Sequence, residues 1–356
     1  MMEKEHINFM PGPVNLHPDT KKIYHDTFLS HRSAKFYHDI SLFRNELCSF
    51  VKVEAAAFFV GSGSLANEVV AQYLKQLGGK GLILVNGEFG KRLTEQAGYI
   101  ELDFDRYAIG LGEAFDYTHL GRMLDANTYK WIWFVHCETS SGILNDLKTI
   151  KDLGDNHGLK VAVDCISTIG NIEVDLSGVY LAAGTSGKGL ASYPGIAMVY
   201  FNPELTELET SCIPKYMNLK HHSDTNWVPY TISTNAFYAL RHSFENISNA
   251  VHRQNIVAIG EFIYNELSAL GFGFLGKREN MMPGIVSIIC PPELNSYELG
   301  LELEKNLFYV NYGGAYLRNA NYFQICVMGH QNMENAKKLV NFLKAKKEAL
   351  ALQIAS

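Results

Sequence analysis

Two kinds of apolar segment are absent from the 356-residue sequence. No apolar run reaches the roughly 18 residues of a membrane-spanning helix, and the start, Met1 to Ile7, has no apolar core. A secretory signal peptide needs such a core. We therefore expect a cytoplasmic protein.

Strong charge and grouped metal ligands are also lacking. The net charge of -6 gives no indication of nucleic-acid binding. The six cysteines are scattered without a Cys-x-x-Cys pair, and His221 and His222 have no spaced partners. We therefore predict neither disulfides nor a metal site.

What the sequence does contain is a repeated order of apolar run, polar residues and helix-like segment. At 47% hydrophobic residues, the chain can bury a core for one large and one small domain. Predicted strands are Ala55–Val60, Gly81–Val85, Trp131–Val135 and Leu159–Val163, followed by Gly61–Ser64, Phe89, Thr139 and Asp164. This order predicts an α/β fold whose large, mostly parallel sheet brings these residues to one edge.

A glycine-rich stretch from Gly184 to Gly195 carries Lys188 between two apolar runs, Val179–Ala183 and Ile196–Phe201. An amine in a partly buried loop can have a lowered pKa and can attack a carbonyl to form a Schiff base. The alternative is a solvated lysine in a turn between two strands. The stretch alone leaves both interpretations open.

Other residues near the ends of the predicted strands and in loops also have both a functional and a structural interpretation. Gly61–Ser64, before a predicted helix, can hold a phosphate or simply cap the helix. Asp164 can bind a ligand or serve as a cap, and Phe89 can stack on a flat ring or pack inside the protein. His31 and Arg32, in a predicted loop, can contact an anion or form a helix-end charge pair.

The character of the sequence changes after Phe201. Residues 203–230 are irregular and precede a helix that Ser233 or Thr234 can cap. A long amphipathic helix at about 249–269 is predicted to lead into strands at 284–289 and 322–327 and helices near 296–305 and 332–346. We predict a large domain with an N-terminal arm over residues 1–250 and a small α+β domain over 251–356.

Together these stretches resemble the class V aminotransferases, which bind pyridoxal 5′-phosphate on the type I, aspartate aminotransferase-like fold. The resemblance covers nearly the whole chain. It is closest to the branch of alanine–glyoxylate, serine–glyoxylate and 2-aminoethylphosphonate–pyruvate aminotransferases, with phosphoserine aminotransferase more distant. The matching residues are Pro11–Pro13, His31–Ser33 with Phe36, Gly61–Ser64, Asn86–Gly90 with Arg92, His136–Thr139, Val163–Asp164, and Lys188 with Pro194–Gly195.

The resemblance implies how the cofactor would be held. Lys188 would bind it as a Schiff base and carry a proton between substrate and cofactor, and Asp164 would pair with the pyridinium nitrogen. Phe89 and Ile166 would contact the two faces of the ring, and Thr139 its polar edge.

The resemblance also implies a shared phosphate site. Ser62, Gly63 and Ser64 would hold the phosphate at the helix start. In this family a Tyr and a Thr of the second subunit reach the same group, and here these match Tyr230 and Thr234. We therefore expect a homodimer with sites at its interface.

Two positions depart from the family's pattern. Gly187 stands where relatives carry an amide that helps to bind the phosphate, which leaves Ser186 or Thr185 for that contact. Gln324 stands where relatives carry an arginine that binds the substrate carboxylate, and the lost charge-assisted pair is worth roughly 1.5–3 kcal/mol. Arg318 is the nearest replacement, or else a solvated loop arginine. His31 and Arg32 are further candidate substrate contacts.

We therefore predict an aminotransferase that moves an amino group from a small amino acid, such as alanine or serine, to a 2-oxo acid such as glyoxylate or pyruvate. Phosphoserine aminotransferase and another class V enzyme of the lyase type are alternatives. A third is a protein that binds pyridoxal phosphate with altered or lost turnover because of Gln324.

Overall fold

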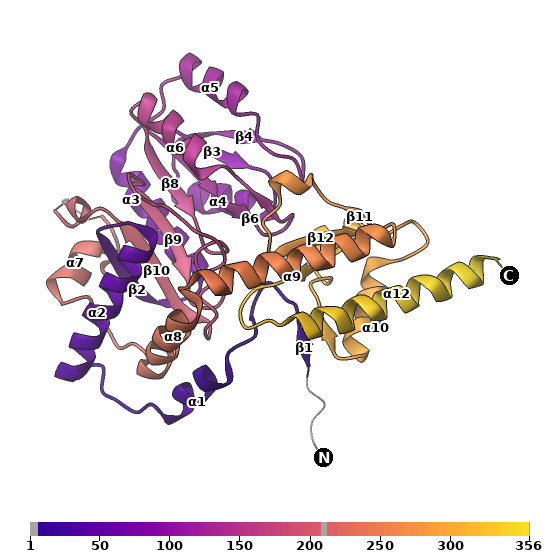
Figure 1. Ribbon diagram of the computed structural model, residues 1–356. Coiled ribbons are helices and arrows are strands. Elements are labelled where there is room, and N and C mark those ends of the chain that lie inside the picture. Colours follow the sequence, from indigo (N-terminus) through magenta and orange to yellow (C-terminus); the bar gives the residue numbers. More distant parts are fainter. Residues whose placement is uncertain (1–5, 208–211, 356) are drawn as a thin grey trace.

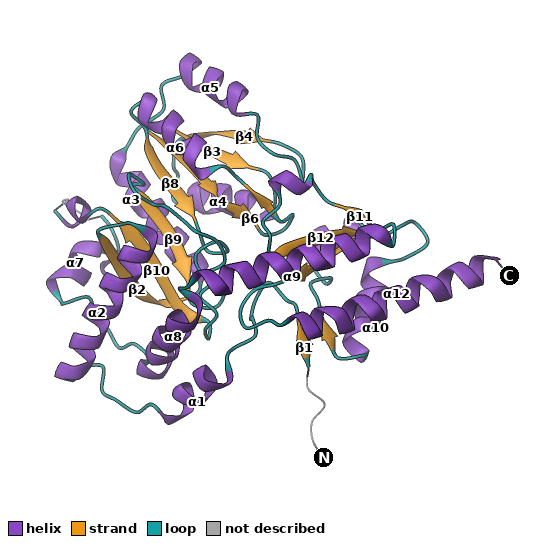
Figure 2. Cartoon of the chain, viewed as in Figure 1, coloured by secondary structure: helices purple, strands orange, loops and turns teal. Residues whose placement is uncertain are grey.

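A seven-stranded sheet forms the centre of the larger part of the molecule in the computed structural model, which describes residues 6–207 and 212–355 (Figures 1 and 2). Its strands, in spatial order, are β2 (Ala55–Gly61), β10 (Gly195–Phe201), β9 (Leu181–Thr185), β8 (Lys160–Asp164), β5 (Trp131–Val135), β3 (Gly81–Val85) and β4 (Phe104–Ala108). β10 pairs antiparallel with both neighbours, and the other pairings are parallel. Every strand except β10 therefore ends at the same edge of the sheet.

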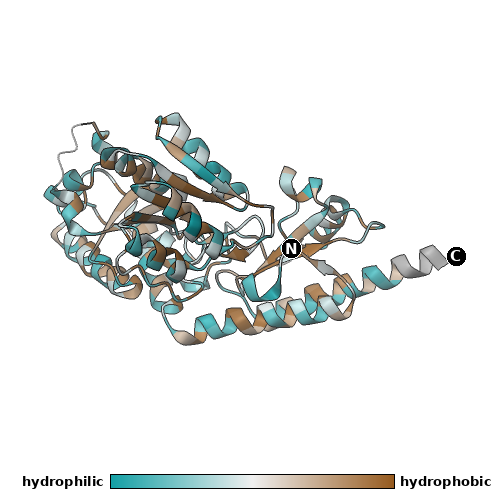
Figure 3. Cartoon of the chain, turned by 90° about the horizontal axis from the view of Figure 1, so that it is seen from above, coloured by the Kyte–Doolittle hydropathy of each residue, from teal (hydrophilic) through white to brown (hydrophobic). Residues whose placement is uncertain are grey.

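Helices cover both faces of this sheet. The helices of this larger part are α1 (Pro18–Asp26), which packs on α8, α2 (Ala34–Val51), α3 (Gly63–Leu77), α4 (Glu88–Tyr99), α5 (Tyr117–Ala126), α6 (Leu147–Asn156), α7 (Leu219–Asp224) and α8 (Thr234–Ile247), with short 3₁₀ turns at Pro203–Thr206 and Lys215–Met217. Because strand side chains alternate between faces, Phe58 packs into the core with α2 and α8, and its neighbour Phe59 packs with α3. Figure 3 shows hydrophobic residues along the strands and mixed colours on the surrounding helices.

The smaller part of the molecule is built on a three-stranded antiparallel sheet. Helix α9 (Ala250–Ala269) leads into its strands β11 (Gly273–Phe274), β12 (Ile285–Ile289) and β14 (Tyr322–Cys326). The remaining elements are a 3₁₀ turn (Arg278–Asn280), α10 (Ser296–Lys305), α11 (Ala315–Asn319) and α12 (Met333–Ala355). α9, α10 and α12 supply the apolar side chains that pack against this sheet.

Two short strand pairs connect distant segments. β1 (Ile7–Asn8) pairs with β13 (Phe308–Tyr309), so the first described strand lies on the C-terminal part of the molecule. β6 (Cys137–Glu138) pairs with β7 (Ile143–Leu144) just beyond β5. The domain limits at residues 250 and 251 remain a prediction.

The predicted α/β architecture, with a large mostly parallel sheet, is confirmed. The last helix runs Met333–Ala355 and so continues well past the predicted 332–346. Among the described helices, none combines the length and the apolar character needed to cross a membrane.

Candidate active site

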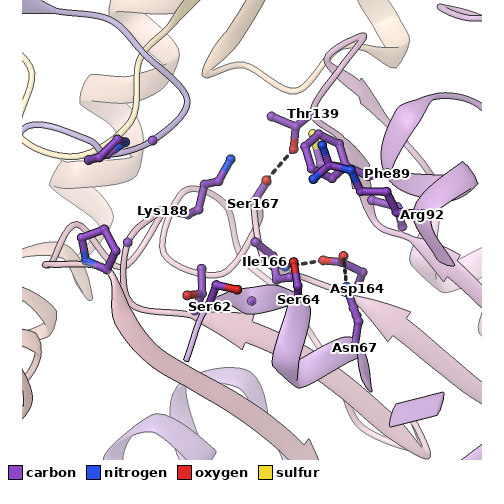
Figure 4. Close-up of a pocket in the computed structure, with 18 of the residues that line it drawn as sticks. Ser62, Ser64, Asn67, Phe89, Arg92, Thr139, Asp164, Ile166, Ser167 and Lys188 are labelled. Atoms are coloured by element: carbon purple, nitrogen blue, oxygen red, sulfur yellow. Dashed lines mark hydrogen bonds between the residues drawn. The ribbon is translucent and has the colours of Figure 1, made fainter. Parts of the chain in front are cut away.

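A pocket opens at the edge of the large sheet where β2, β3, β5, β8 and β9 end (Figure 4). Its cavity volume is about 370 Å³. Its lining residues come from the N-terminal arm, the starts of α3 and α4, the ends of the strands and the Lys188 loop. They are Gly12, Pro13, Ser62, Gly63, Ser64, Asn67, Phe89, Arg92, Gln96, Val135, Cys137, Thr139, Asp164, Ile166, Ser167, Thr185, Gly187, Lys188 and Pro194.

Lys188 reaches this pocket from the loop between β9 and β10. Its amine has no hydrogen-bond or ion-pair partner among the described residues, and Nζ lies 5.8 Å from the centroid of the Phe89 ring. A Cβ added at Gly12 would lie 3.3 Å from Lys188 Cε, so the N-terminal arm passes close beside the lysine. Burial lowers the pKa of the amine. An unpartnered amine of this kind favours the functional interpretation of Lys188 over a solvated turn.

Asp164 is buried at the end of β8. Its Oδ2 accepts a hydrogen bond from Asn67 Nδ2 at 2.7 Å, and its Oδ1 accepts one from the backbone N–H of Ile166 at 2.9 Å. Burial raises the pKa of this carboxyl to about 6, although both hydrogen bonds oppose the shift. A cationic group placed in the pocket would therefore stabilise the charged form of Asp164.

The start of α3 presents Ser62, Gly63 and Ser64 to the pocket. Ser62 occupies the N-cap position but makes no side-chain capping hydrogen bond. A Cβ added at Gly63 would lie 2.5 Å from Ile166 Cδ1, so glycine is needed for Ile166 to approach the helix start. Helix N–H groups and an uncommitted serine hydroxyl together suit a phosphate.

Glu138 holds Phe89 at the edge of the pocket. Its carboxylate accepts hydrogen bonds from the backbone N–H groups of Phe89 at 3.1 Å, Gly90 at 3.0 Å and Ser140 at 3.0 Å. Gly87 is the N-cap residue of α4 and has no side chain, so Glu138 satisfies the N–H groups at the start of this helix. The guanidinium carbon of Arg92, one turn further, lies 4.8 Å from the centroid of the Phe89 ring.

The pocket also contains a hydroxyl pair. Thr139 Oγ1 and Ser167 Oγ lie 2.6 Å apart, and both residues line the pocket (Figure 4). Thr139 follows β6 and Ser167 follows β8, so their hydrogen bond connects the loops that follow these two strands. Ile166, next to Ser167, lines the pocket between this pair and the start of α3.

Gln324 is buried outside the pocket, in β14 of the smaller sheet. Its Nε2 donates to Thr139 O at 2.8 Å and to Ser287 Oγ at 2.9 Å, with Ser140 O at 3.2 Å. Its Oε1 accepts a hydrogen bond from Asn311 Nδ2 at 2.7 Å. Because every polar atom of the amide has a partner, Gln324 joins the smaller sheet to the loop after β6.

Three other predicted residues are held away from the pocket by contacts elsewhere. Ser186 Oγ donates to Tyr193 O at 2.6 Å and accepts from Ile196 N at 3.2 Å, within its own loop, whereas Thr185 lines the pocket. Arg32 donates to the carbonyl oxygens of Val228 at 2.7 Å and Pro229 at 3.2 Å. Arg318 is exposed and lies over the ring of Tyr297, at 5.4 Å from its centroid. The structure therefore does not bring Ser186, Arg32 or Arg318 into the pocket.

Tyr230, Thr234 and His31 do not line the pocket of their own chain either. Tyr230 stacks on Tyr216, with ring centroids 4.8 Å apart, and Thr234 Oγ1 donates to Leu29 O at 2.8 Å. His31 lies in the turn before α2. The contribution of Tyr230 and Thr234 to a second subunit's site remains a prediction.

The pocket also contains residues that the sequence analysis assigned no role, namely Asn67, Arg92, Gln96, Cys137 and Ser167. Two of them had a signal in the sequence. Asn67 follows Ser64 by three residues and so shares its helix face, and Arg92 follows Phe89 by the same interval. The others depend on how helices and loops pack together, which spacing does not encode.

A profile of the family described as aminotransferase class V matches residues 24–313. The chain belongs to the class V aminotransferases. The resemblance expected from the sequence is thereby confirmed. This is a family of pyridoxal 5′-phosphate enzymes, which agrees with the lysine, carboxylate and helix start gathered in one pocket.

Curated relatives and solved structures give a consistent picture. A 2-aminoethylphosphonate–pyruvate transaminase of Pseudomonas aeruginosa is 29% identical over 243 residues, which span 65% of this chain and 66% of the relative. An alanine–glyoxylate aminotransferase from Nostoc sp. superposes with a TM-score of 0.89 at 22% identity, covering 97% of this chain and 96% of the other. An aspartate aminotransferase from Thermus thermophilus gives 0.88 at 22% identity, covering 97% and 99%. The two structures show a shared fold and so confirm the predicted aspartate aminotransferase-like architecture.

The residues in this pocket fit the cofactor of the family. Lys188 offers an unpartnered amine, Asp164 a buried carboxyl, and Ser62 an uncommitted hydroxyl beside helix N–H groups. Asn67 Oδ1 is buried and has no hydrogen-bond partner in the described part of the chain, although its amide nitrogen holds Asp164. An unsatisfied buried polar atom is costly, so the Asn67 oxygen together with the unpartnered Lys188 amine favours a polar ligand in this pocket.

Proposed function

We propose that this class V aminotransferase binds pyridoxal 5′-phosphate and transfers an amino group from a small amino acid to a 2-oxo acid such as glyoxylate or pyruvate. One observation carries the proposal: the Lys188 amine, the Asp164 carboxyl and the start of α3 line a single pocket. The activities named for the relatives support the reaction class.

Each part of the cofactor would be contacted by different residues of the pocket. Ser62, Gly63 and Ser64 would hold the phosphate, and Asp164 would pair with the ring nitrogen. Phe89 and Ile166 would contact the ring, with Thr139 at its polar edge. When bound, the cofactor supplies an electron sink for charge that develops at the substrate Cα.

Lys188 would move the proton in this reaction. Burial lowers the pKa of its amine and so favours the unprotonated form of Nζ, which can accept the proton from the substrate Cα. The same nitrogen can later donate that proton. Asp164 would remain charged while a cationic ring nitrogen offsets the cost of its burial.

We also propose that the protein acts as a cytoplasmic homodimer in which Tyr230 and Thr234 reach the phosphate of the second subunit. Thr234 bonds to Leu29 O, next to Phe28, whose side chain is 100% exposed. A large exposed apolar side chain beside a proposed shared site suits a subunit interface.

Absorbance spectroscopy with borohydride reduction tests the cofactor assignment. We expect purified protein supplied with pyridoxal 5′-phosphate to show an absorbance band near the visible edge that borohydride abolishes, with the label mapped to Lys188. Lys188→Ala should abolish both the label and transamination, a loss of at least about 10³-fold. Cofactor bound without a covalent link to Lys188 would contradict the mechanism.

One alternative has a specific observation in its favour. Gln324 does not line the pocket, so the arginine that relatives use there has no direct substitute at that position. A protein that binds the cofactor without turnover would show the Lys188 label but no loss of the absorbance band with any amino acid of a panel. Conversion of the band by one donor would establish turnover.

A further inference from the structure

The proposed reaction raises the question of which residue binds the acid group of the substrate. An arginine is suited to this role because its planar guanidinium can donate two parallel hydrogen bonds to a carboxylate or a phosphonate. Among the described residues that line the pocket, the cations are Arg92 and Lys188. Lys188 is the proposed cofactor-binding residue, which leaves Arg92 as the cation for a substrate acid.

Arg92 is not committed to another partner. Among the described residues, no carboxylate lies within ion-pairing distance of its guanidinium, and no side chain or carbonyl accepts a hydrogen bond from it. Its described contact is with the face of Phe89, at 4.8 Å from guanidinium carbon to ring centroid. This stacking orients the guanidinium plane without using its N–H groups, which remain available to an anion at the rim of the pocket.

The other candidate residues for binding the substrate acid are committed elsewhere. Arg32 donates to two backbone carbonyls, and Arg318 lies over Tyr297 on the exposed side of α11. Gln324 is buried, and its amide is saturated by Thr139, Ser287 and Asn311. None of these three residues lines the pocket.

The charge of Arg92 acts on groups in both parts of the molecule. The charge of Arg92 contributes to lowering the pKa of Lys188, after burial as the main cause. It also opposes the rise in the pKa of Tyr316, which burial causes. Tyr316 OH accepts a hydrogen bond from Asn311 Nδ2 at 3.3 Å, and Asn311 is the partner of Gln324. The charge of Arg92 is thus felt at Tyr316 on α11, which contacts the partner of Gln324.

The proposed phosphate site lies elsewhere in the pocket. Figure 4 shows Ser62 well separated from Arg92, which lies on the far side of the labelled residues beside Phe89. The Arg92 guanidinium lies beside Phe89 and away from the start of α3. This position suits contact with the substrate rather than with the cofactor phosphate.

We propose that Arg92, in the second turn of α4, binds the acid group of the substrate and takes the role that relatives give to the arginine at the position of Gln324. The inference rests on the proposed function, because it assumes that the cofactor occupies Lys188. The substrate class it names is a small acid carrying a carboxylate or a phosphonate within reach of the Arg92 guanidinium.

Titration of the cofactor-loaded enzyme with simple anions tests this proposal. The probes are acetate and methylphosphonate, with acetamide as the neutral control, and binding is followed by calorimetry and by the shift of the cofactor absorbance band. The variants are Arg92→Gln and Arg92→Lys, with Arg318→Gln as the matched control at an exposed arginine. Equal band intensity in all four proteins first establishes equal cofactor loading.

We expect Arg92→Gln to raise the Kd of whichever anion binds wild type by about tenfold or more, because charge-assisted hydrogen bonds are lost. Arg92→Lys should give a smaller increase, Arg318→Gln no change, and acetamide no binding. The anion that binds more tightly to wild type distinguishes a carboxylate from a phosphonate substrate.

Three results would overturn the inference. They are unchanged anion affinity in Arg92→Gln, binding of neither anion to loaded wild type, and a loss of cofactor affinity in Arg92→Gln without a change in anion Kd. The last would assign Arg92 to the cofactor phosphate. Failure of wild type to load cofactor at Lys188 would instead contradict the proposed function, and the absorbance band reports that before any anion is added.

Discussion

The two walls that meet at the pocket use their polar atoms in opposite ways. On the large-sheet wall, the Lys188 amine and Asn67 Oδ1 have no hydrogen-bond partner among the described residues, and Ser62 leaves its helix uncapped. Behind the other wall, Gln324 and its neighbours satisfy one another. Unsatisfied buried groups cost stability unless a ligand pairs with them, whereas satisfied ones maintain the fold. The contrast separates binding residues from structural ones without any ligand present.

The largest expected effect on stability comes from the satisfied wall. Replacing Gln324 by leucine would leave the Thr139 carbonyl oxygen without its partner and would leave Asn311 Nδ2 with only its longer hydrogen bond to Tyr316 OH. We expect the free energy of unfolding of the cofactor-free protein to fall by about 3 kcal/mol. Urea unfolding followed by circular dichroism measures this change.

Gln254→Leu provides the control, because Gln254 is exposed on α9. This variant should change the free energy of unfolding by less than about 0.5 kcal/mol. Equal effects at positions 324 and 254 would show that the hydrogen bonds of Gln324 contribute nothing beyond those of an exposed glutamine, and the contrast between the walls would fail.

A smaller effect is expected from Asp164, through pH. The folded-state pKa is about 6, above the ordinary value of 3.8, so between these values the folded protein binds more protons than the unfolded chain. The cofactor-free protein should therefore lose stability as pH rises from about 4 to 6, on the order of 2 kcal/mol. Asp164→Asn should lack this slope, although it also loses a hydrogen bond at every pH.

Unfolding free energies measured at several pH values across this window, with and without pyridoxal 5′-phosphate, provide the test. In the loaded wild-type protein a cationic ring nitrogen should reduce the slope, because it favours the charged carboxylate. The same slope in wild type and Asp164→Asn would mean that other carboxyls account for it.

The sequence was sufficient to predict the sheet edge and the residues gathered there. Apolar strands followed by polar residues placed Ser62, Phe89, Thr139 and Asp164 at one edge because parallel strands end together, and all four line the pocket. Local pattern decides such features, since strand direction follows from the helical connections between strands.

The sequence did not reveal hydrogen-bond partners that depend on tertiary packing. Glu138 lies within the family-matching stretch His136–Thr139, but its role in holding the start of α4 depends on a contact about fifty residues away along the chain. The replacement of arginine by Gln324 was visible as a departure. The hydrogen bonds of its amide were not visible. They depend on how β14 packs against the loop after β6, which supplies the contact to Thr139, and on the neighbouring Ser287 and Asn311.

The smallest expected effect comes from Lys188 and has the opposite sign. Lys188→Met removes an unpartnered amine from a site where burial lowers its pKa, and the thioether can pack against the neighbouring Phe89 ring. We expect the cofactor-free variant to be more stable than wild type by about 1 kcal/mol at pH 7 while transamination is lost. Because the folded-state pKa lies below the ordinary 10.5, the unfolded chain binds more protons between the two values, so wild-type stability rises with pH there. The advantage of Lys188→Met should therefore shrink as pH approaches 10 in urea unfolding. A variant that is less stable than wild type at pH 7 would show that the amine has a stabilising partner, and the large-sheet wall would no longer differ from the wall at Gln324.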